Sequence, residues 1–204
     1  HLGGNLISGS GVTFSGEFDI YGNSDTVFEW GTGTFVENLH LFTSTSSHRD
    51  YFIRDGVTID NSILDFGTHS HLEISAGAEI RNTTIYRSGN SYIAGIFSNV
   101  TIDSNYDYQD FWIQGGGLIL EGSLTLKTAL SGARSGGFID ANGNTIILDL
   151  TERSSKDSAM IGVNYVSEDV LFQINLNENQ VPGKYAIATG AGNFVDTFSI
   201  SVEG

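Results

Sequence analysis

The 204-residue chain contains no cysteine, a single proline and few basic residues. The absence of cysteine excludes disulfide scaffolds and thiolate metal sites. Nine Lys and Arg against 24 Asp and Glu give a formal net charge of −15, which leaves no basic stripe for binding nucleic acid or anionic lipid. No apolar run approaches the ~20 residues of a membrane-spanning helix, and no signal peptide is recognisable. We therefore expect no nucleic-acid partner and no membrane insertion of this segment, which begins without Met and which we interpret as part of a longer protein.

Short runs of β-branched and aromatic residues dominate the remaining sequence. They alternate with polar residues and end at Gly, Asn, Asp or Ser, which is the pattern of β-strands bounded by turns. Examples are the segments 26–30 (TVFEW), 57–60 (VTID), 118–121 (LILE) and 145–150 (TIILDL). Helical periodicity is nearly absent, so the sequence predicts an all-β fold.

The strands recur with a regular spacing. Segments 57–64 (VTIDNSIL) and 78–85 (AEIRNTTI) align without a gap, and related frames contain Asn38, Asn99, Gly122 and Asn144. Successive frames are 17 to 23 residues apart, a spacing typical of one coil of a β-solenoid. Stacking such coils at the ~4.8 Å strand spacing buries their inward side chains in one continuous core. We therefore predict a right-handed parallel β-solenoid, with a β-sandwich or jelly roll as the alternative because the frames vary in length.

The alignment also predicts two columns of side chains. Asparagine tolerates left-handed backbone conformations and can hydrogen-bond to its counterpart in the next coil. We expect such a ladder at one corner, formed by Asn61, Asn82 and Asn99. We expect one inward column to contain Ile59, Ile80 and Ile102.

The pattern changes after about residue 150. We predict a solenoid stalk over residues 1–150 and, over residues 151–204, a β-rich continuation or cap of the same domain, since an open solenoid end needs protection against edge pairing. The sequence segments NGNTIILDL (142–150), FQINL (172–176) and VPGKYAIATGAGNF (181–194) resemble units in bacterial autotransporter passengers and filamentous adhesins. The resemblance implies an exported module of the bacterial cell surface. It would act as an adhesin or scaffold, not an enzyme, with a glycan or protein of a host or neighbouring cell as partner.

The segment 103–112 combines aromatic and acidic residues. Aromatic rings stack on sugar faces, and carboxylates accept hydrogen bonds from hydroxyl groups. The candidate ligand-binding residues are Tyr106, Tyr108, Asp110 and Trp112. The alternative is a loop whose aromatic side chains pack back on the stalk.

The same segment contains part of a calcium-loop motif. Asp103, Asn105 and Asp107 have the D-x-N-x-D spacing that supplies alternate oxygen ligands to a hard cation. Tyr108 stands where the motif has Gly, and Gln114 where it has Glu. We therefore predict no obligatory cofactor and keep calcium as a candidate ligand of these three residues.

Two further hypotheses about the function stay open. Parallel β-helices also carry polysaccharide lyases and glycosidases, so we predict that an enzyme would use carboxylates gathered on one exposed face. The candidates are Asp60, Asp65, Glu73 and Glu79. A phage tail-spike segment is the third functional class.

His69 and His71 would face the same side of a strand, which could begin a zinc site, but the sequence specifies no third zinc ligand. We expect them to be exposed strand residues together with His40 and His48.

Overall fold

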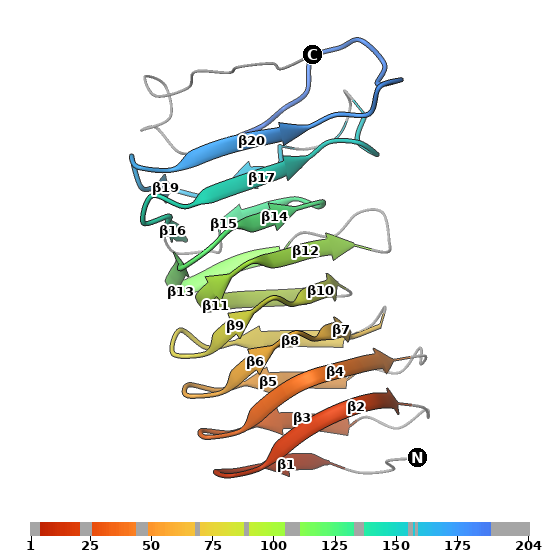
Figure 1. Ribbon diagram of the computed structural model, residues 1–204, viewed down its shortest axis with the longest axis vertical. Coiled ribbons are helices and arrows are strands. Elements are labelled where there is room, and N and C mark those ends of the chain that lie inside the picture. Colours follow the sequence, from red (N-terminus) through yellow and green to blue (C-terminus); the bar gives the residue numbers. More distant parts are fainter. Residues whose placement is uncertain are drawn as a thin grey trace.

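The computed structural model describes residues 5–20, 26–43, 49–67, 70–87, 90–104, 111–132, 137–154, 157 and 159–188 of the chain. All the regular secondary structure in these residues is β-strand, and all the strand pairs among them are parallel. The strands stack along the long axis of the molecule, with the N-terminal coils at one end and the C-terminal coils at the other (Figure 1). The predicted parallel β-solenoid is confirmed, and the sandwich alternative is wrong.

Each coil contributes to three parallel ladders of strands. The first ladder contains β1 (Leu6–Ser8), β3 (Thr26–Trp30), β5 (Arg49–Ile53), β8 (Ser70–Ile74), the start of β11 (Asn90–Ser98), the start of β13 (Phe111–Leu120), β15 (Leu130–Gly132) and β18 (Ile161–Gly162). The second contains the starts of β2 (Thr13–Ile20) and β4 (Phe35–Thr43), β6 (Thr58–Asp60), β9 (Glu79–Arg81), the ends of β11 and β13, β16 (Phe138–Asp140) and β19 (Tyr165–Val166). The third contains the ends of β2 and β4, β7 (Ile63–Asp65), β10 (Thr84–Arg87), β12 (Val100–Ser104), β14 (Leu124–Leu126), β17 (Thr145–Asp149) and β20 (Leu171–Asn175).

The core lies between the three ladders and is built from columns of inward side chains. In the second ladder Ile80 pairs with Ile59 on one side and with Phe97 on the other, and all three are fully buried. The expected column was wrong in its third member, because Ile102 pairs with Ile85 in the third ladder. Ile85 and Ile102 each stand three residues after a corner asparagine. Ile80 and its equivalent Phe97 each stand two residues before one.

Asparagine forms the sharp corner between the second and third ladders. Asn38, Asn61, Asn82 and Asn99 all have positive φ, between 45° and 55°. Asn61 donates a hydrogen bond from Nδ2 to Asn38 Oδ1 at 2.6 Å, and Asn99 donates to Asn82 Oδ1 at 3.2 Å. Asn82 Nδ2 donates to Asp60 Oδ1 at 2.8 Å. The predicted step between Asn82 and Asn99 is thus present. The step expected between Asn61 and Asn82 is made to the Asp60 carboxylate instead, and Asn61 bonds to Asn38.

One coil is shorter than its neighbours, and the next coil compensates. At the corner between the first and second ladders, β11 turns within a bulge at Gly95. The loop at the same corner of β13 reaches past this short coil. Gln114 Nε2 donates to the Ile74 carbonyl at 3.0 Å, and a Cβ at Gly116 would lie 2.5 Å from the Ala76 Cβ. A coil of 17 residues is therefore tolerated because a glycine loop fills the space beside it.

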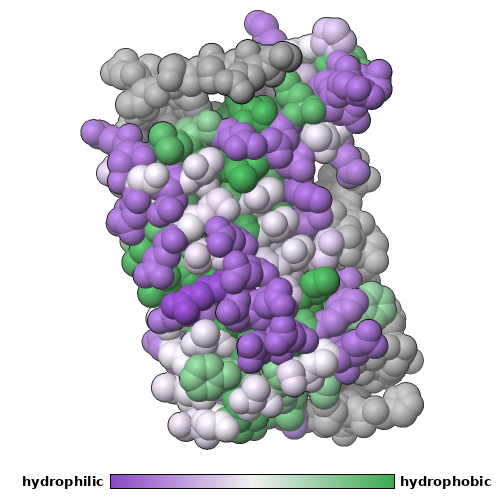
Figure 2. Space-filling view, in the orientation of Figure 1, coloured by the Kyte–Doolittle hydropathy of each residue, from purple (hydrophilic) through white to green (hydrophobic). Residues whose placement is uncertain are grey.

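The face formed by the second and third ladders is mostly polar. Figure 2 shows a band of hydrophilic side chains across the lower half of this face, with hydrophobic side chains scattered around it. Phe35, Phe42 and Ile63 are among the exposed hydrophobic residues of these two ladders. Isolated exposed apolar side chains are ordinary on protein surfaces. The first ladder lies on the far side in this view (Figure 1).

Candidate functional site

Four aromatic side chains form a continuous row on the outer surface of the first ladder. Phe52, His71, Tyr92 and Trp112, which we name the aromatic row, come from β5, β8, β11 and β13. Their positions alternate with buried residues, so their rings point outward and are half-buried. Ring centroids are 6.0 Å apart between Phe52 and His71, 5.4 Å between His71 and Tyr92, and 5.2 Å between Tyr92 and Trp112. Phe52, Tyr92 and Trp112 share one column of the parallel register, in which Glu73 stands between Phe52 and Tyr92. His71 stands two residues earlier, in register with Asp50 and Asn90, so the rings of four successive coils form a staggered row.

Charged residues lie beside one end of the row. Arg54 donates to Glu29 Oε2 at 3.1 Å and to Glu73 Oε1 at 3.4 Å, and its guanidinium lies 4.4 Å from the centre of the Phe52 ring. Two of the five N–H groups of this guanidinium are thereby used, and its side chain is 36% exposed. The arginine covers Phe52 and holds both carboxylates. Tyr92 stands in register with Glu73, and Trp112 lies one strand farther from this charged group.

The predicted ligand-binding segment meets the row at Trp112. Trp112 is the second residue of β13 and is half-buried in contact with Tyr92. The other three ligand-binding candidates, Tyr106, Tyr108 and Asp110, lie outside the described residues. Sequence analysis missed Phe52, His71 and Tyr92 because each stands in a different coil. The signal that would have found them is an aromatic residue at an outward position in consecutive coils of one ladder.

The calcium site predicted at Asp103, Asn105 and Asp107 remains a prediction. Asn105 and Asp107 lie outside the described residues, and Asp103 is near the end of β12, where its Oδ2 lies 3.6 Å from Lys127 Nζ. Within the described part of the chain, no group of three or more His, Asp or Glu residues is arranged to hold a metal ion. His71 belongs to the aromatic row, and His69 falls outside the described residues.

The four carboxylates considered for catalysis do not share one face. Glu73 lies on the first ladder, Asp60 and Glu79 on the second, and Asp65 on the third. Glu79 Oε2 is 2.6 Å from Arg81 Nη2. The expectation that these acids converge was wrong, because neighbouring sequence frames assign them to different ladders. Glu29 and Glu73 do share a face, but Arg54 lies between them and pairs with both.

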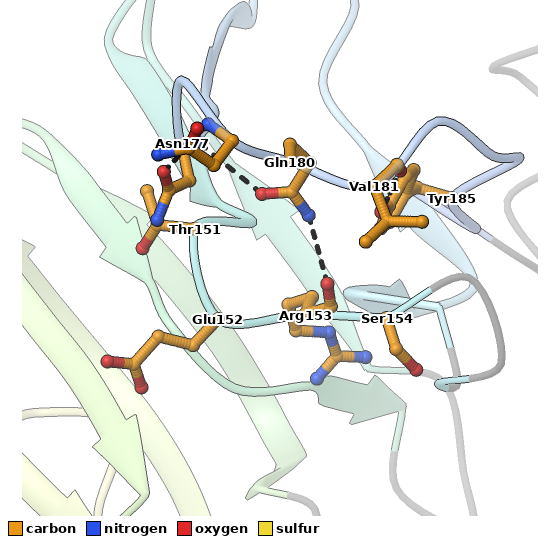
Figure 3. Close-up of a pocket in the computed structure, with 9 residues that line it drawn as sticks. Thr151, Glu152, Arg153, Ser154, Asn177, Gln180, Val181 and Tyr185 are labelled. Carbon is orange, nitrogen blue, oxygen red and sulfur yellow. Dashed lines mark hydrogen bonds between the residues drawn. The ribbon is translucent and has the colours of Figure 1, made fainter.

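A shallow pocket of about 290 Å³ lies between two loops near the C-terminal coils (Figure 3). Its walls come from residues 151–154, after β17, and from residues between 177 and 185, after β20. Gln180 joins the two walls, since its Nε2 donates to the Arg153 carbonyl at 2.9 Å and its Oε1 accepts from the Asn177 N–H at 3.3 Å (Figure 3). Tyr185 donates to the Val181 carbonyl at 2.6 Å. These polar groups bind each other, so we interpret the pocket as a junction between loops.

Comparisons with protein-family models, with curated proteins and with solved structures find no match to this chain. The described residues also contain no helix with the length and hydrophobicity needed to cross a membrane. What the chain does must therefore be argued from its fold and from the side chains on its surface.

Proposed function

We propose that this chain is a binding module in which a stiff solenoid presents its first-ladder face to a glycan or protein partner. The aromatic row carries the proposal. Half-buried rings with hydrogen-bonding groups beside them are the chemistry of ligand surfaces that combine apolar contact with orientation. Because each ring is fixed by its own strand and packs on the next ring, the row is ordered before any ligand arrives.

We further propose that the module belongs to an exported bacterial surface protein and acts there as an adhesin or scaffold. The resemblance of residues 140–204 to autotransporter passengers and filamentous adhesins supports this setting. A long parallel stack with its strand edges paired from coil to coil suits a stalk that holds binding surfaces away from a cell.

A carbohydrate-active enzyme is the second candidate, and the observation that favours it is the pair Glu29 and Glu73 on the same face as the aromatic row. Glycosidases use two carboxylates of which one is protonated before the reaction. Arg54 lies between the two acids and pairs with both, so it occupies the space in which a glycosidic bond would have to lie between them. We therefore favour binding without catalysis.

A screen of the chain on an array of glycans and on surface-protein extracts tests the binding proposal. We expect saturable binding to at least one class of target, together with no new reducing ends or unsaturated products when the bound polysaccharide is incubated with the chain. The absence of binding to every target would overturn the proposal. Bond cleavage that is lost in a Glu73→Gln variant would replace it with the enzyme alternative.

A further inference from the structure

We infer that the aromatic row binds an uncharged, extended glycan chain that lies parallel to the long axis of the solenoid. This inference rests on the proposed function and names the ligand class for its binding face. It commits to a glycan and makes a protein partner an outcome of the test.

The direction of the ligand follows from the direction of the row. The four rings belong to four consecutive coils of the first ladder, so the row runs along the coil axis, with His71 displaced by two residues from the register of the other three rings. Three strand spacings separate its ends, which gives a length of about 14 Å. No ring centroid is more than 6.0 Å from the next one in the row. A polymer with one sugar after another in a nearly straight line would meet ring after ring, whereas a compact ligand would meet one or two.

The width of the row favours a linear ligand over a protein surface. The row is narrow, because Phe52, Tyr92 and Trp112 share one register column with Glu73 and His71 stands in the column beside it, and charged or polar residues border the rings. Asp50 and Asn90 occupy the outward positions two residues before Phe52 and Tyr92, while Arg54 and Gln114 follow on the other side. A stable protein interface needs a broad desolvated centre, commonly about 800 Å² on each partner. A strip of half-buried rings between polar margins matches the apolar ring faces and peripheral hydroxyls of a sugar chain.

The negative charge beside the aromatic row favours an uncharged sugar over an anionic one. Glu29 and Glu73 stand in register with Phe52 on its two sides, so that Glu73 lies between Phe52 and Tyr92, and Arg54 pairs with both carboxylates. The chain as a whole carries a formal charge of −15. A polysaccharide of uronic acids or sulfated sugars would be repelled by these carboxylates and by the net charge of the chain. Hydroxyl groups can instead donate to the two carboxylates and accept from the remaining N–H groups of Arg54.

The roles within the row differ. Arg54 covers the Phe52 ring, so Phe52 positions the arginine more than it offers a surface to ligand. Tyr92 and Trp112 are the principal stacking residues, with His71 between Phe52 and Tyr92. Loss of either principal ring should weaken binding more than loss of an exposed aromatic residue on another ladder. Tyr165, which is 46% exposed in β19 of the second ladder, provides that matched control.

The first experiment uses calorimetric titration of the whole chain with β-1,4-linked oligomers of glucose and of N-acetylglucosamine, from disaccharide to hexasaccharide. We expect affinity to rise with length until the row is filled and then to level off. The charged comparison is the β-1,4-linked glucuronic acid hexamer, which keeps the backbone of the glucose hexamer and has a carboxylate in place of the hydroxymethyl group of each sugar. The charged hexamer should bind at least tenfold more weakly than the glucose hexamer. Added salt should narrow the difference in affinity between the two, because it screens the repulsion.

The second experiment compares variants. Tyr92→Ala and Trp112→Ala should each weaken binding of the preferred neutral hexamer about tenfold, while Tyr165→Ala should leave it unchanged. Trp112→Tyr should restore most of the affinity. Circular dichroism and thermal melting check that each variant is folded. If a row variant does not fold, the comparisons of length and charge on the wild-type chain still decide the inference.

The outcomes separate this inference from the proposed function. Binding to a protein, or to anionic glycans, without binding to either neutral series would overturn the inference and leave the proposed function standing. Equal loss of affinity in the Tyr165 and Trp112 variants would also overturn it. No binding to any target would overturn both.

Discussion

Truncation of Ile80 to alanine tests the inward packing of the solenoid most sharply. Ile80 is 0% exposed, and its side chain lies in the column between Ile59 and Phe97. Its removal deletes buried methyl and methylene groups from a site whose backbone is held on both sides by parallel neighbours, so the cavity can collapse little. We expect Ile80→Ala to lower the free energy of unfolding by about 2–5 kcal/mol, with the upper half of that range favoured by the rigid surroundings.

Chemical denaturation followed by circular dichroism measures this effect. The matched control is Thr84→Ala in β10, where the side chain points outward and should change stability by less than about 0.5 kcal/mol. The slope of the transition should be the same in wild type and both variants, so that the comparison reflects stability and not a change in cooperativity. A loss below about 1 kcal/mol for Ile80→Ala, or an equal loss in the control, would refute the inward register.

Three further predictions follow from the corner, the glycine loop and the buried tyrosine. Asn82→Gly should lower the melting temperature less than Asn82→Ala, because both lose the side-chain hydrogen bonds but only glycine accepts φ of 48° without strain. Gly116→Val should destabilise the fold in thermal melts, since its Cβ would lie 2.5 Å from that of Ala76, whereas Gly115→Ala, with no heavy atom within 4 Å of its Cβ, should not. Burial raises the pKa of Tyr51 to about 12, so the stabilising contribution of its neutral form is present below pH 10 and is lost as the pH rises from 10 to 12. The free energy of unfolding should therefore fall by about 2 kcal/mol more in wild type than in Tyr51→Phe over that interval in pH-dependent denaturation; parallel curves would contradict this origin.

The fold was predictable because its physical cause repeats along the chain. Each coil has to present apolar side chains inward and turn at a corner, so the sequence carries the same frame many times. Asn61 and Asn82 stand at corresponding positions of two such frames and both adopt positive φ. The frame was misread where a coil is short. Counting forward from Asn99 leads to the third ladder, and the second-ladder position is found only by counting back to Phe97.

The candidate site was predictable only in part, because it is made by stacking and not by local sequence. Trp112 was identified from a cluster of aromatic and acidic residues within ten positions of the chain. Tyr92 belongs to the same row but is separated from Trp112 by a whole coil. The register that brings them together depends on the length of every turn between them. The placement of the four candidate carboxylates on one face was wrong for the same reason. Residues that are close in the aligned frames, such as Asp60 and Asp65, belong to different ladders.

Tryptophan fluorescence tests the central claim most directly, since the chain contains only two tryptophans. Trp30 is buried and its Nε1 has no hydrogen-bond partner among the described residues, so Trp30→Phe should be tolerated and leaves Trp112 as the reporter. On titration with the neutral hexasaccharide that binds best, the emission of Trp112 should shift to shorter wavelength and become protected from acrylamide, with the same dissociation constant as calorimetry gives. Binding by calorimetry with no change in the emission or quenching of Trp112 would place the ligand elsewhere and contradict the account.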